Sequence, residues 1–451
     1  MSVCSDVISY ARKINADECE SILCTKKIIT VRITDSEIAE IKESHEKSLG
    51  VRLIHKKRIS CAQTTTLDPI KIVDNALKSA KNVTERKFWE SFPENTTDII
   101  LEKVNDPKLW KIDAINASDI AQEMINSAQN QKITKISGSL NVVCEEFEIA
   151  NTSGLQKNDV ATYISGVINS DSDIGTSPVS GIGQVNSRTL SNFHPEVVGS
   201  ESSKMCINSI NPQTVNSGTT NIIFEPFAVG ELLAFVFTSN FALKTYSEKR
   251  SCFSEKIGEK IAVDGFDLVD DPHCPNGLGS KSFDDEGVST KPTHYIRNGI
   301  FEKTYSDLYN SYKEDTLPSG NACRLGSPLG RSSEPVPVSA PHNLTLGGGN
   351  TKRDDIIKDT KNGILISRLW YTYPVNPIRG DFSCTARSGI WIIENGQIRS
   401  PAKSVRIIHD LPRLLQQISA IGNNGRVVLP WAAMPITAPT IRCDGVRVNL
   451  I

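Results

Sequence analysis

The stretch that decides the fold is Asn221 to Lys244, NIIFEPFAVGELLAFVFTSNFALK. Its first four residues, which end at Phe224, predict a short buried strand. The apolar residues from Val229 to Leu243 recur at helical spacing. The chain is therefore predicted to run from a buried strand directly into a core-facing helix.

Zinc peptidases commonly carry their ligands at a corner of this kind. Two histidines about one turn apart on a helix hold the ion, and an adjacent Glu acts as general base toward a zinc-bound water. The stretch from Asn221 to Lys244 contains no histidine. Glu225 and Glu231 remain, and carboxylates without imidazole partners make a poor zinc site. The corner therefore has the expected shape of a metal site without the ligands.

Length and composition indicate the class of protein. A chain of 451 residues is long enough for about two domains with substantial cores. The formal charge of −2 gives no basic footprint, so no nucleic-acid partner is expected. The first helix is amphipathic and differs from a secretion signal, and no apolar run is long enough to span a membrane. The eleven cysteines form no C-x-x-C pair, which favours reduced thiols and a cytoplasmic location.

The first half, residues 1–210, is predicted to be an α+β domain in which an antiparallel sheet packs on helices. Strand-like segments cover 21–33, 36–43 and 50–61. A helix starts with Asp68 as N-cap and Pro69 at its first position. A later helix is expected to begin at a Ser118 cap.

Two strands then follow, over 136–150 and 155–169, and Gly154 supplies the positive backbone angle of the turn between them. The segment 170–194 is predicted to be a long loop or an irregular edge strand that leads to a helix near 195–208. Composition shifts at 211–220, which we take as the domain boundary. The second domain, 211–451, is predicted to be β-rich, with short strands and one main helix.

The acidic run Asp284-Asp285-Glu286 is the most tempting chemical motif. Neighbouring carboxylates could share a proton or hold a hard cation. The same carboxylates could equally cap backbone amides at a turn closed by Gly287. Aromatic residues later in the chain could line a groove or pack in the core, namely Trp370, Tyr371, Tyr373 and Trp391.

A replacement metal site would need side chains that lie far apart in the sequence. The candidates are histidines and cysteines of the second half, which could equally be polar turn residues and buried thiols: His273, Cys274, His294, Cys323, His342, Cys384 and His409.

Several blocks of the sequence together resemble the TldD/PmbA family, once named modulators of DNA gyrase. In the second half these are FEPFAVGELL, SFDDEGVST at 282–290, IRNGIFEKTYSD at 296–307, SGNACR at 319–324 and GDFSCTARSGIWIIENGQI at 380–398. In the first half, GVRLIHKKRISCAQTTTLDPIKIVDNALKSAKN and ANTSGL are similar to that family's amino-terminal domain.

The resemblance implies one of two branches. TldD proteins bind zinc through an H-E-x-x-x-H helix and a late Gly-Thr-Cys-Gly segment, and they cleave extended or unfolded peptides. PmbA proteins, also called TldE, share the fold without these ligands and pair with the catalytic subunit. Aligning the motif puts Phe224 and Glu225 at His-Glu and Val229 at the second His, so only the glutamate survives. Cys443 does not match the late ligand position, and the chain is therefore similar to the PmbA branch.

This resemblance implies a non-catalytic component with no catalytic or metal-binding residues of its own. The implied partners are a TldD-like subunit or a second copy of the chain, together with an extended peptide, and zinc is expected only in a TldD-like partner. The candidate residues near the implied peptide or partner cleft are Asp284, Asp285, Glu286, Asn321 and Arg324. Two alternatives stay open: a self-sufficient metallopeptidase with rearranged ligands, and a homodimeric peptide-binding scaffold.

Overall fold

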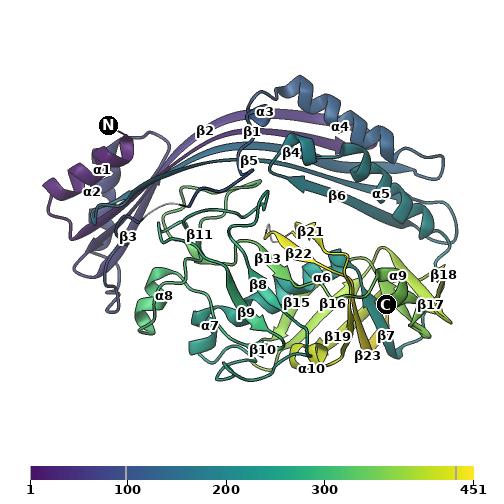
Figure 1. The fold of residues 1–451 in the computed structure, drawn as a ribbon. Helices are drawn as coiled ribbons and strands as arrows, with labels where there is room; N and C mark the ends of the chain where they lie inside the picture. Colours follow the sequence, from purple (N-terminus) through teal and green to yellow (C-terminus); the bar gives the residue numbers. More distant parts are fainter. Residues whose placement is uncertain (1, 97–98, 432–433) are drawn as a thin grey trace.

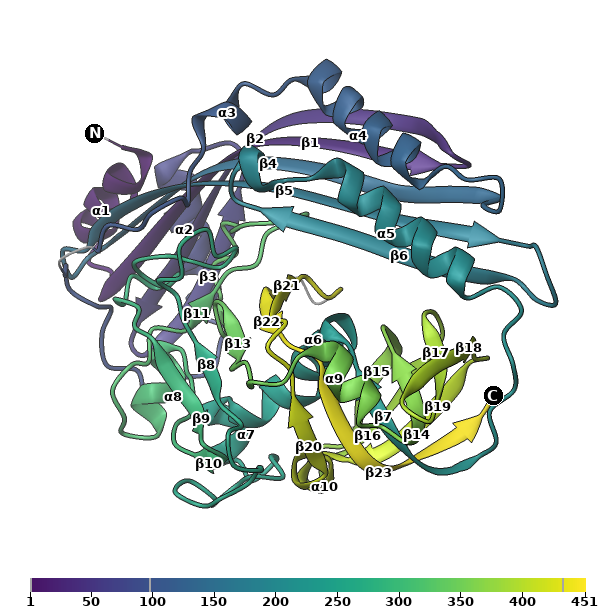
Figure 2. The same ribbon diagram turned by 45° about the vertical axis from the view of Figure 1, so that its right-hand side comes forward.

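A computed structural model describes residues 2–96, 99–431 and 434–451. The chain has the predicted α+β fold. A long curved sheet arches over the second half of the chain, with helices on its outer side (Figure 1). A view turned by 45° shows the second half lying beneath the inner side of the same sheet (Figure 2). No helix of the described ranges is long and apolar enough to cross a membrane.

The arching sheet is antiparallel, with strand order β3-β2-β1-β4-β5-β6. It is built from β1 (Glu18–Thr34), β2 (Glu37–His55), β3 (Arg58–Thr64), β4 (Lys135–Asn151), β5 (Gln156–Ser172) and β6 (Val179–Ser187). The expected strands over 36–43 and 50–61 were wrong in their limits, because β2 runs unbroken from 37 to 55. The chain reverses at Lys56 and Lys57, whose φ angles of 52° and 55° form a two-residue turn without glycine.

Both faces of the arching sheet contribute buried residues, as β1 illustrates, whereas residues 37–47 of β2 are largely exposed. Its odd-numbered residues Cys19, Ile29 and Val31 pack in clusters with the helices. Its even-numbered residues Glu20 and Lys26 contact the second half of the chain. Since successive side chains of a strand point to opposite faces, one strand carries both interfaces.

The helices over this sheet confirm most of the predicted starts. Asp68 accepts hydrogen bonds from the Ile70 and Lys71 amides, as expected of an N-cap. The Ser118 cap was wrong, because Asp113 caps the helix in a reciprocal capping box with Asn116. The segment 170–194 contains β6, so the edge-strand alternative holds. The elements are α1 (Val3–Lys13), α2 (Pro69–Ala80), α3 (Pro107–Trp110), α4 (Ala114–Ala128), η1 (Leu190–Asn192) and α5 (Pro195–Asn208).

The second half is rich in short strands, as predicted. A six-stranded sheet has the order β10-β9-β8-β13-β22-β21, with β8 (Leu268–Asp270), β9 (Thr293–Arg297), β10 (Ile300–Phe301), β13 (Leu344–Leu346), β21 (Arg426–Val428) and β22 (Ile436–Ala438). A pair of two-residue strands, β11 (Ala322–Cys323) and β12 (Val338–Ser339), lies apart from it.

The largest sheet of the second half has nine strands, in the order β15-β16-β19-β23-β7-β14-β17-β18 with β20 paired to β23. Its members are β7 (Gly218–Phe224), β14 (Asn362–Ile366), β15 (Leu369–Asn376), β16 (Asp381–Ala386), β17 (Ile390–Glu394), β18 (Gln397–Pro401), β19 (Val405–Asp410), β20 (Ile418–Ile421) and β23 (Ile441–Leu450). Short helices connect the strands, namely α8 (Leu308–Lys313), α9 (Arg353–Lys358) and α10 (Leu411–Gln416).

The predicted main helix over 229–243 is not continuous. It divides into α6 (Pro226–Leu232), a π turn η2 (Leu233–Phe237), a 3-10 turn η3 (Thr238–Phe241) and α7 (Leu243–Ser247). Polar side chains explain the change of winding. The Thr238 hydroxyl donates to the Leu233 carbonyl, and the Asn240 side-chain amide donates to the Val236 carbonyl. In a regular α-helix, backbone amides would donate to these two carbonyls.

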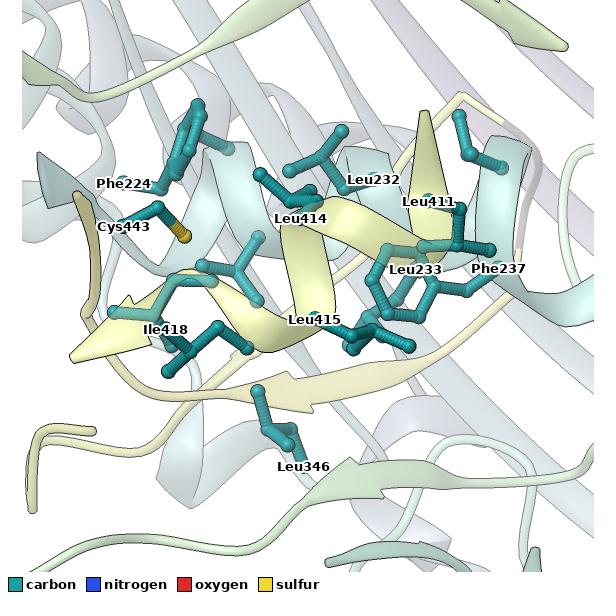
Figure 3. Close-up of a cluster of buried hydrophobic side chains, with 14 of the residues drawn as sticks. Phe224, Leu232, Leu233, Phe237, Leu346, Leu411, Leu414, Leu415, Ile418 and Cys443 are labelled. Atoms are coloured by element: carbon teal, nitrogen blue, oxygen red, sulfur yellow. The ribbon is translucent and has the colours of Figure 1, made fainter. Parts of the chain in front are cut away.

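The core of the second half gathers around the strand-helix corner between β7 and α6. Leu411, Leu414 and Leu415 of α10 pack in one cluster with Leu232 and Phe237 (Figure 3). The same cluster contains Phe224 and Cys443, both fully buried. The corner therefore serves as the centre of an apolar core.

Candidate functional site

The strand-helix corner buries the positions that the resemblance aligned with zinc-binding histidines. Phe224 ends β7 opposite Ile441 of β23, and it is 1% exposed. Val229 lies in α6 and is 2% exposed. Both side chains belong to the apolar cluster of the second half. Two side chains that would have to reach a metal ion are here part of a hydrophobic core.

Glu225, the third position of the aligned motif, is held by neighbouring side chains. The Arg353 guanidinium donates to its carboxylate, with Nε 2.6 Å and Nη2 2.5 Å from Oε1. The Ser367 hydroxyl donates to the other oxygen, and the backbone amide of Glu225 donates to the Ile366 carbonyl at 2.9 Å. These bonds tie α6 to β14 and α9, so the carboxylate has an evident structural use.

Glu231, six residues after Glu225 and near the end of α6, has a different environment. It is 4% exposed, and burial raises the pKa of its carboxyl to about 7, although the positive charge of Arg368 acts in the opposite direction. A buried carboxyl that titrates near neutral pH next to a cationic residue is typical of functional sites.

Arg368 lies between β14 and β15, beside two indole rings. Its Cζ atom is 4.2 Å from the ring centre of Trp370 and 5.6 Å from that of Trp431. The side chain is 3% exposed, and burial lowers the pKa of its guanidinium to about 10, partly offset by Glu231. Neither Arg368 Nε nor Trp370 Nε1 has a hydrogen-bond acceptor among the described residues.

These side chains line a hollow between the arching sheet and the second half. The hollow has a volume of about 320 Å³ and is lined by Ser137, Gly138, Val167, Asn169, Ser180, Ile182, Arg368, Trp370, Arg387, Ser388 and Trp431. We call it the arginine pocket. It brings together β4, β5 and β6 with segments more than 170 residues later in the chain. The prediction that Trp370 lines a groove agrees with this position, whereas no sequence pattern singled out Arg368, Arg387 or Trp431.

A second hollow of about 680 Å³ adjoins the arginine pocket at Gly138, which lines both. It follows the inner face of the arching sheet along β1, β2 and β4, and it also touches Ser327 and Pro328. We call it the sheet groove. Its lining combines the charged side chains of Arg32, Glu40, Lys42 and Glu46 with apolar surface that includes Ile28 and Pro328.

The acidic run lies in the interior, in an ion-pair network between the two halves of the chain. Glu286 accepts from Arg52 at 2.6 Å, and Asp285 pairs with Lys281 at 2.9 Å and with Arg331 at 3.1 Å. Although burial opposes it, the positive charges of Lys281 and Arg331 lower the pKa of Asp285 to about 2.

The other three residues that were predicted to lie near a cleft, Asp284, Asn321 and Arg324, also have hydrogen-bond or ion-pair partners. Asp284 accepts hydrogen bonds from the backbone amides of Glu286, Val288 and Ala322, which is the capping role proposed for this run. The Asn321 amide donates to Asp270 at 2.8 Å, and the Arg324 guanidinium pairs with Glu20 at 2.6 Å. The structure thus brings Asp284, Asp285, Glu286, Asn321 and Arg324 together as buried residues. Of these, Arg324 pairs with β1 and Glu286 pairs with β2.

The histidines and cysteines proposed for a rearranged metal site are not gathered. Within residues 2–96, 99–431 and 434–451, no three His, Cys, Asp or Glu side chains are placed to hold an ion. His342 Nε2 lies 2.7 Å from the Gly320 carbonyl, and His273 Nε2 lies 3.1 Å from the Thr290 hydroxyl. Burial raises the pKa of the Cys384 and Cys443 thiols.

Models of known protein families match two segments of the chain. A family model of the PmbA/TldA metallopeptidase C-terminal domain matches residues 217–450, and a model of domain 1 of the same family matches 19–82. A "Metalloprotease PmbA homolog" of Buchnera aphidicola is 27% identical over 235 residues, 51% of this chain and 47% of the relative. The chain therefore spans about half the length of such curated relatives.

Solved structures match the fold over nearly the whole chain. TldE from Thermococcus kodakarensis superposes with a TM-score of 0.89 at 22% identity, covering 99% of this chain and 100% of that one. A Thermotoga maritima protein described as a modulator of a DNA gyrase gives a TM-score of 0.87 at 20% identity, covering 99% of both chains. These two likenesses concern the fold. Because the C-terminal family model spans more than half of the residues, the protein belongs to the metallopeptidase-related TldD/PmbA family.

Proposed function

We propose that this protein is a non-catalytic, PmbA/TldE-like component of a TldD-type zinc peptidase system, in which it binds extended peptide and a partner subunit. The observation that carries the proposal is the burial of Phe224 and Val229 in an apolar core at the positions where zinc-binding histidines would stand. A zinc-bound water cannot be generated where no imidazole faces the site.

The inner side of the arching sheet supports a peptide-binding role. The sheet groove and the arginine pocket adjoin at Gly138 and form one hollowed path beneath β1, β2, β4 and β5. An extended peptide needs a long, shallow site with polar groups for its main chain, and it needs little side-chain chemistry. Within this path, the sheet groove extends along three strands, and charged side chains such as Arg32 and Glu40 line it.

The nine-stranded sheet supports a partner role. Its edge strand β15 exposes Tyr371 (68%), Tyr373 (44%) and Val375 (57%), and Ile408 of β19 is 54% exposed. Tyr373 and Ile408 lie in one cross-strand row, since each faces Ser383 of β16. Exposed apolar residues grouped on a sheet mark a surface for another protein chain, here a TldD-like subunit or a second copy. All eleven cysteines are free thiols, which suits the cytoplasm.

The test is to purify the chain alone and together with a TldD-like protein from the same genome. Zinc content, complex formation and hydrolysis of an unstructured fluorogenic peptide are then measured. We expect no hydrolysis by the chain alone, and chelator-sensitive hydrolysis by the mixture. Tyr373→Asp combined with Ile408→Asp should abolish the complex, while Ile300→Asp, a similarly exposed residue elsewhere, should not.

Two outcomes would replace the proposal. Chelator-sensitive hydrolysis by the pure chain, with stoichiometric zinc, would establish a metallopeptidase with rearranged ligands. A stable homodimer that binds peptide and forms no complex with the TldD-like protein would establish a scaffold without a peptidase partner.

A further inference from the structure

The arginine pocket contains buried N–H donors that have no acceptor among the residues that the structure describes. These donors are Arg368 Nε and Trp370 Nε1. Arg368 is only 3% exposed, so water has little access to its side chain. Burying a polar group without a hydrogen bond costs about 1–3 kcal/mol. A ligand that enters the hollow and supplies a hydrogen-bond acceptor would remove this cost.

The chemistry of the lining indicates which ligand that is. The pocket contains two guanidinium groups, of the buried Arg368 and the exposed Arg387, and no carboxylate lines it in the described parts of the chain. Neither arginine has an ion pair with a described carboxylate. A guanidinium presents a planar fork of donors that matches a carboxylate in geometry and charge. The guanidinium of Arg368 lies over the indole rings of Trp370 and Trp431. Its N–H groups, at the edge of the guanidinium plane, are therefore the atoms that can bind a ligand.

The size and position of the pocket narrow the choice further. Its volume of about 320 Å³ lies at the lower end of the range for ligand sites, which suits one residue of a chain better than a whole peptide. The sheet groove begins at Gly138 and offers a path of about 680 Å³ for the residues before it. The pocket is thus placed where a chain lying in the groove would end.

We propose that the arginine pocket binds a carboxylate group of an extended peptide, with Arg368 and Arg387 as donors and Trp370 and Trp431 as flanking surfaces. The inference rests on the proposed peptide-binding function and adds to it a preference for the carboxylate at the end of the chain. A glutamate side chain would supply the same group from within a chain.

The direct test measures binding to the purified chain by fluorescence anisotropy. Three labelled hexapeptides share one uncharged sequence: one ends in a free carboxylate, one in an amide, and one in an amide preceded by Glu. We expect the free acid to bind about tenfold or more tightly than the plain amide, as a charge-assisted pair provides. Equal binding of the Glu amide and the free acid would show that the pocket accepts either carboxylate, which supports the pocket and overturns the preference for the end of the chain.

Variants separate the pocket from the rest of the peptide site. Arg368→Gln should reduce the preference for the free acid to less than about threefold, and Arg387→Gln, which changes an exposed residue, should weaken it several-fold. Arg399→Gln, an exposed arginine of β18 outside the pocket, is the matched control and should leave it intact. Equal affinity of wild type for acid and amide, or loss of the preference in the control, would overturn the inference.

A small probe distinguishes failure of the pocket from failure of the peptide role. N-acetyl-leucine should change the fluorescence of Trp370 and Trp431 saturably, and N-acetyl-leucinamide should not. If peptides bind without regard to their carboxylates and N-acetyl-leucine does not bind, the pocket inference is wrong while peptide binding stands. If N-acetyl-leucine binds and no peptide does, the pocket stands as a carboxylate site and the proposed peptide role is wrong.

Discussion

The guanidinium of Arg324 lies 2.6 Å from the carboxylate of Glu20, and both side chains are fully buried. Glu20 belongs to β1, and Arg324 follows 304 residues later. The same carboxylate also pairs with Arg52 of β2 at 2.9 Å, and Arg52 reaches Glu286 at 2.6 Å. The two halves of the molecule are therefore joined by a connected set of buried charges as well as by apolar contacts.

Removing one member of this set should be costly. We expect Glu20→Gln to lower the free energy of unfolding by about 3–5 kcal/mol. Arg324 would lose its ion pair while it stays buried, and Arg52 would keep only its ion pair with Glu286. Urea unfolding followed by circular dichroism measures the change. The control is Lys260→Gln, which removes an exposed ion pair with Asp264 and should change stability by less than about 1 kcal/mol. Equal effects of the two variants would show that the buried pair is not a stabilising link.

The close approach of the halves also depends on glycine. A Cβ atom at Gly50 would lie 2.0 Å from the Ser333 carbonyl oxygen, so Gly50→Ala should force β2 away from the second half. We expect a loss of at least about 1–3 kcal/mol, as for overpacked interiors. Gly425→Ala is the control, because its Cβ would meet only the Thr437 methyl group at 3.7 Å. Thermal unfolding of the two variants compares them, and a Gly50→Ala protein as stable as wild type would contradict this account.

Local signals allowed much of the first half to be predicted from sequence. Asp68 and Pro69 mark the start of α2 through cap chemistry that involves neighbouring residues alone. The turn at Lys56 and Lys57 carries no such signal, because two lysines with positive φ are not what a hairpin turn usually contains. The end of β2 was missed for that reason, and its continuity was missed because its polar residues 44–48 are largely exposed and show no apolar pattern.

The candidate site depends on contacts between distant residues, which no local pattern reports. The acidic run was predicted to share a proton or hold a cation, or else to cap backbone amides, and the family resemblance placed it near a cleft. Its burial depends on Arg52 and Arg331, which lie far from it in sequence. Arg368 is a candidate ligand-binding residue because it lines one hollow with Trp431 and with residues of β4 and β6. These residues lie far apart in the sequence and meet only in the folded chain.

Restoring the missing histidines should not restore a metal site. Phe224→His combined with Val229→His places two imidazoles in the apolar core around α10, where they lose packing and hydrogen-bond partners. We expect a loss of about 3 kcal/mol or more in the free energy of unfolding and no stoichiometric zinc. Denaturant unfolding and elemental analysis provide the readouts, with Thr219→His on the exposed part of β7 as control. Tight zinc binding by a stable double variant would show that the corner is an intact site lacking only its ligands.

The buried carboxyl of Glu231 should make stability depend on pH. Its pKa rises from an ordinary 4.5 to about 7 in the folded chain, so the folded state binds a proton there that the unfolded state releases between these values. The stabilisation of the protonated form is complete below pH 4.5, declines as pH rises, and is lost above pH 7, a change of about 3 kcal/mol. Arg368 stays protonated throughout, because the pKa of its guanidinium remains near 10.

Glu231→Gln removes this titrating group and keeps the shape of the side chain. Unfolding free energies of wild type and variant, measured in urea from pH 4.5 to pH 8, should therefore diverge: the wild type loses stability relative to the variant as pH rises. His342 and the other histidines are present in both proteins, so their contributions cancel in the difference. A difference that stays constant over this range would mean that Glu231 ionises in the folded protein as it does in water, and that its place beside Arg368 is solvated rather than buried.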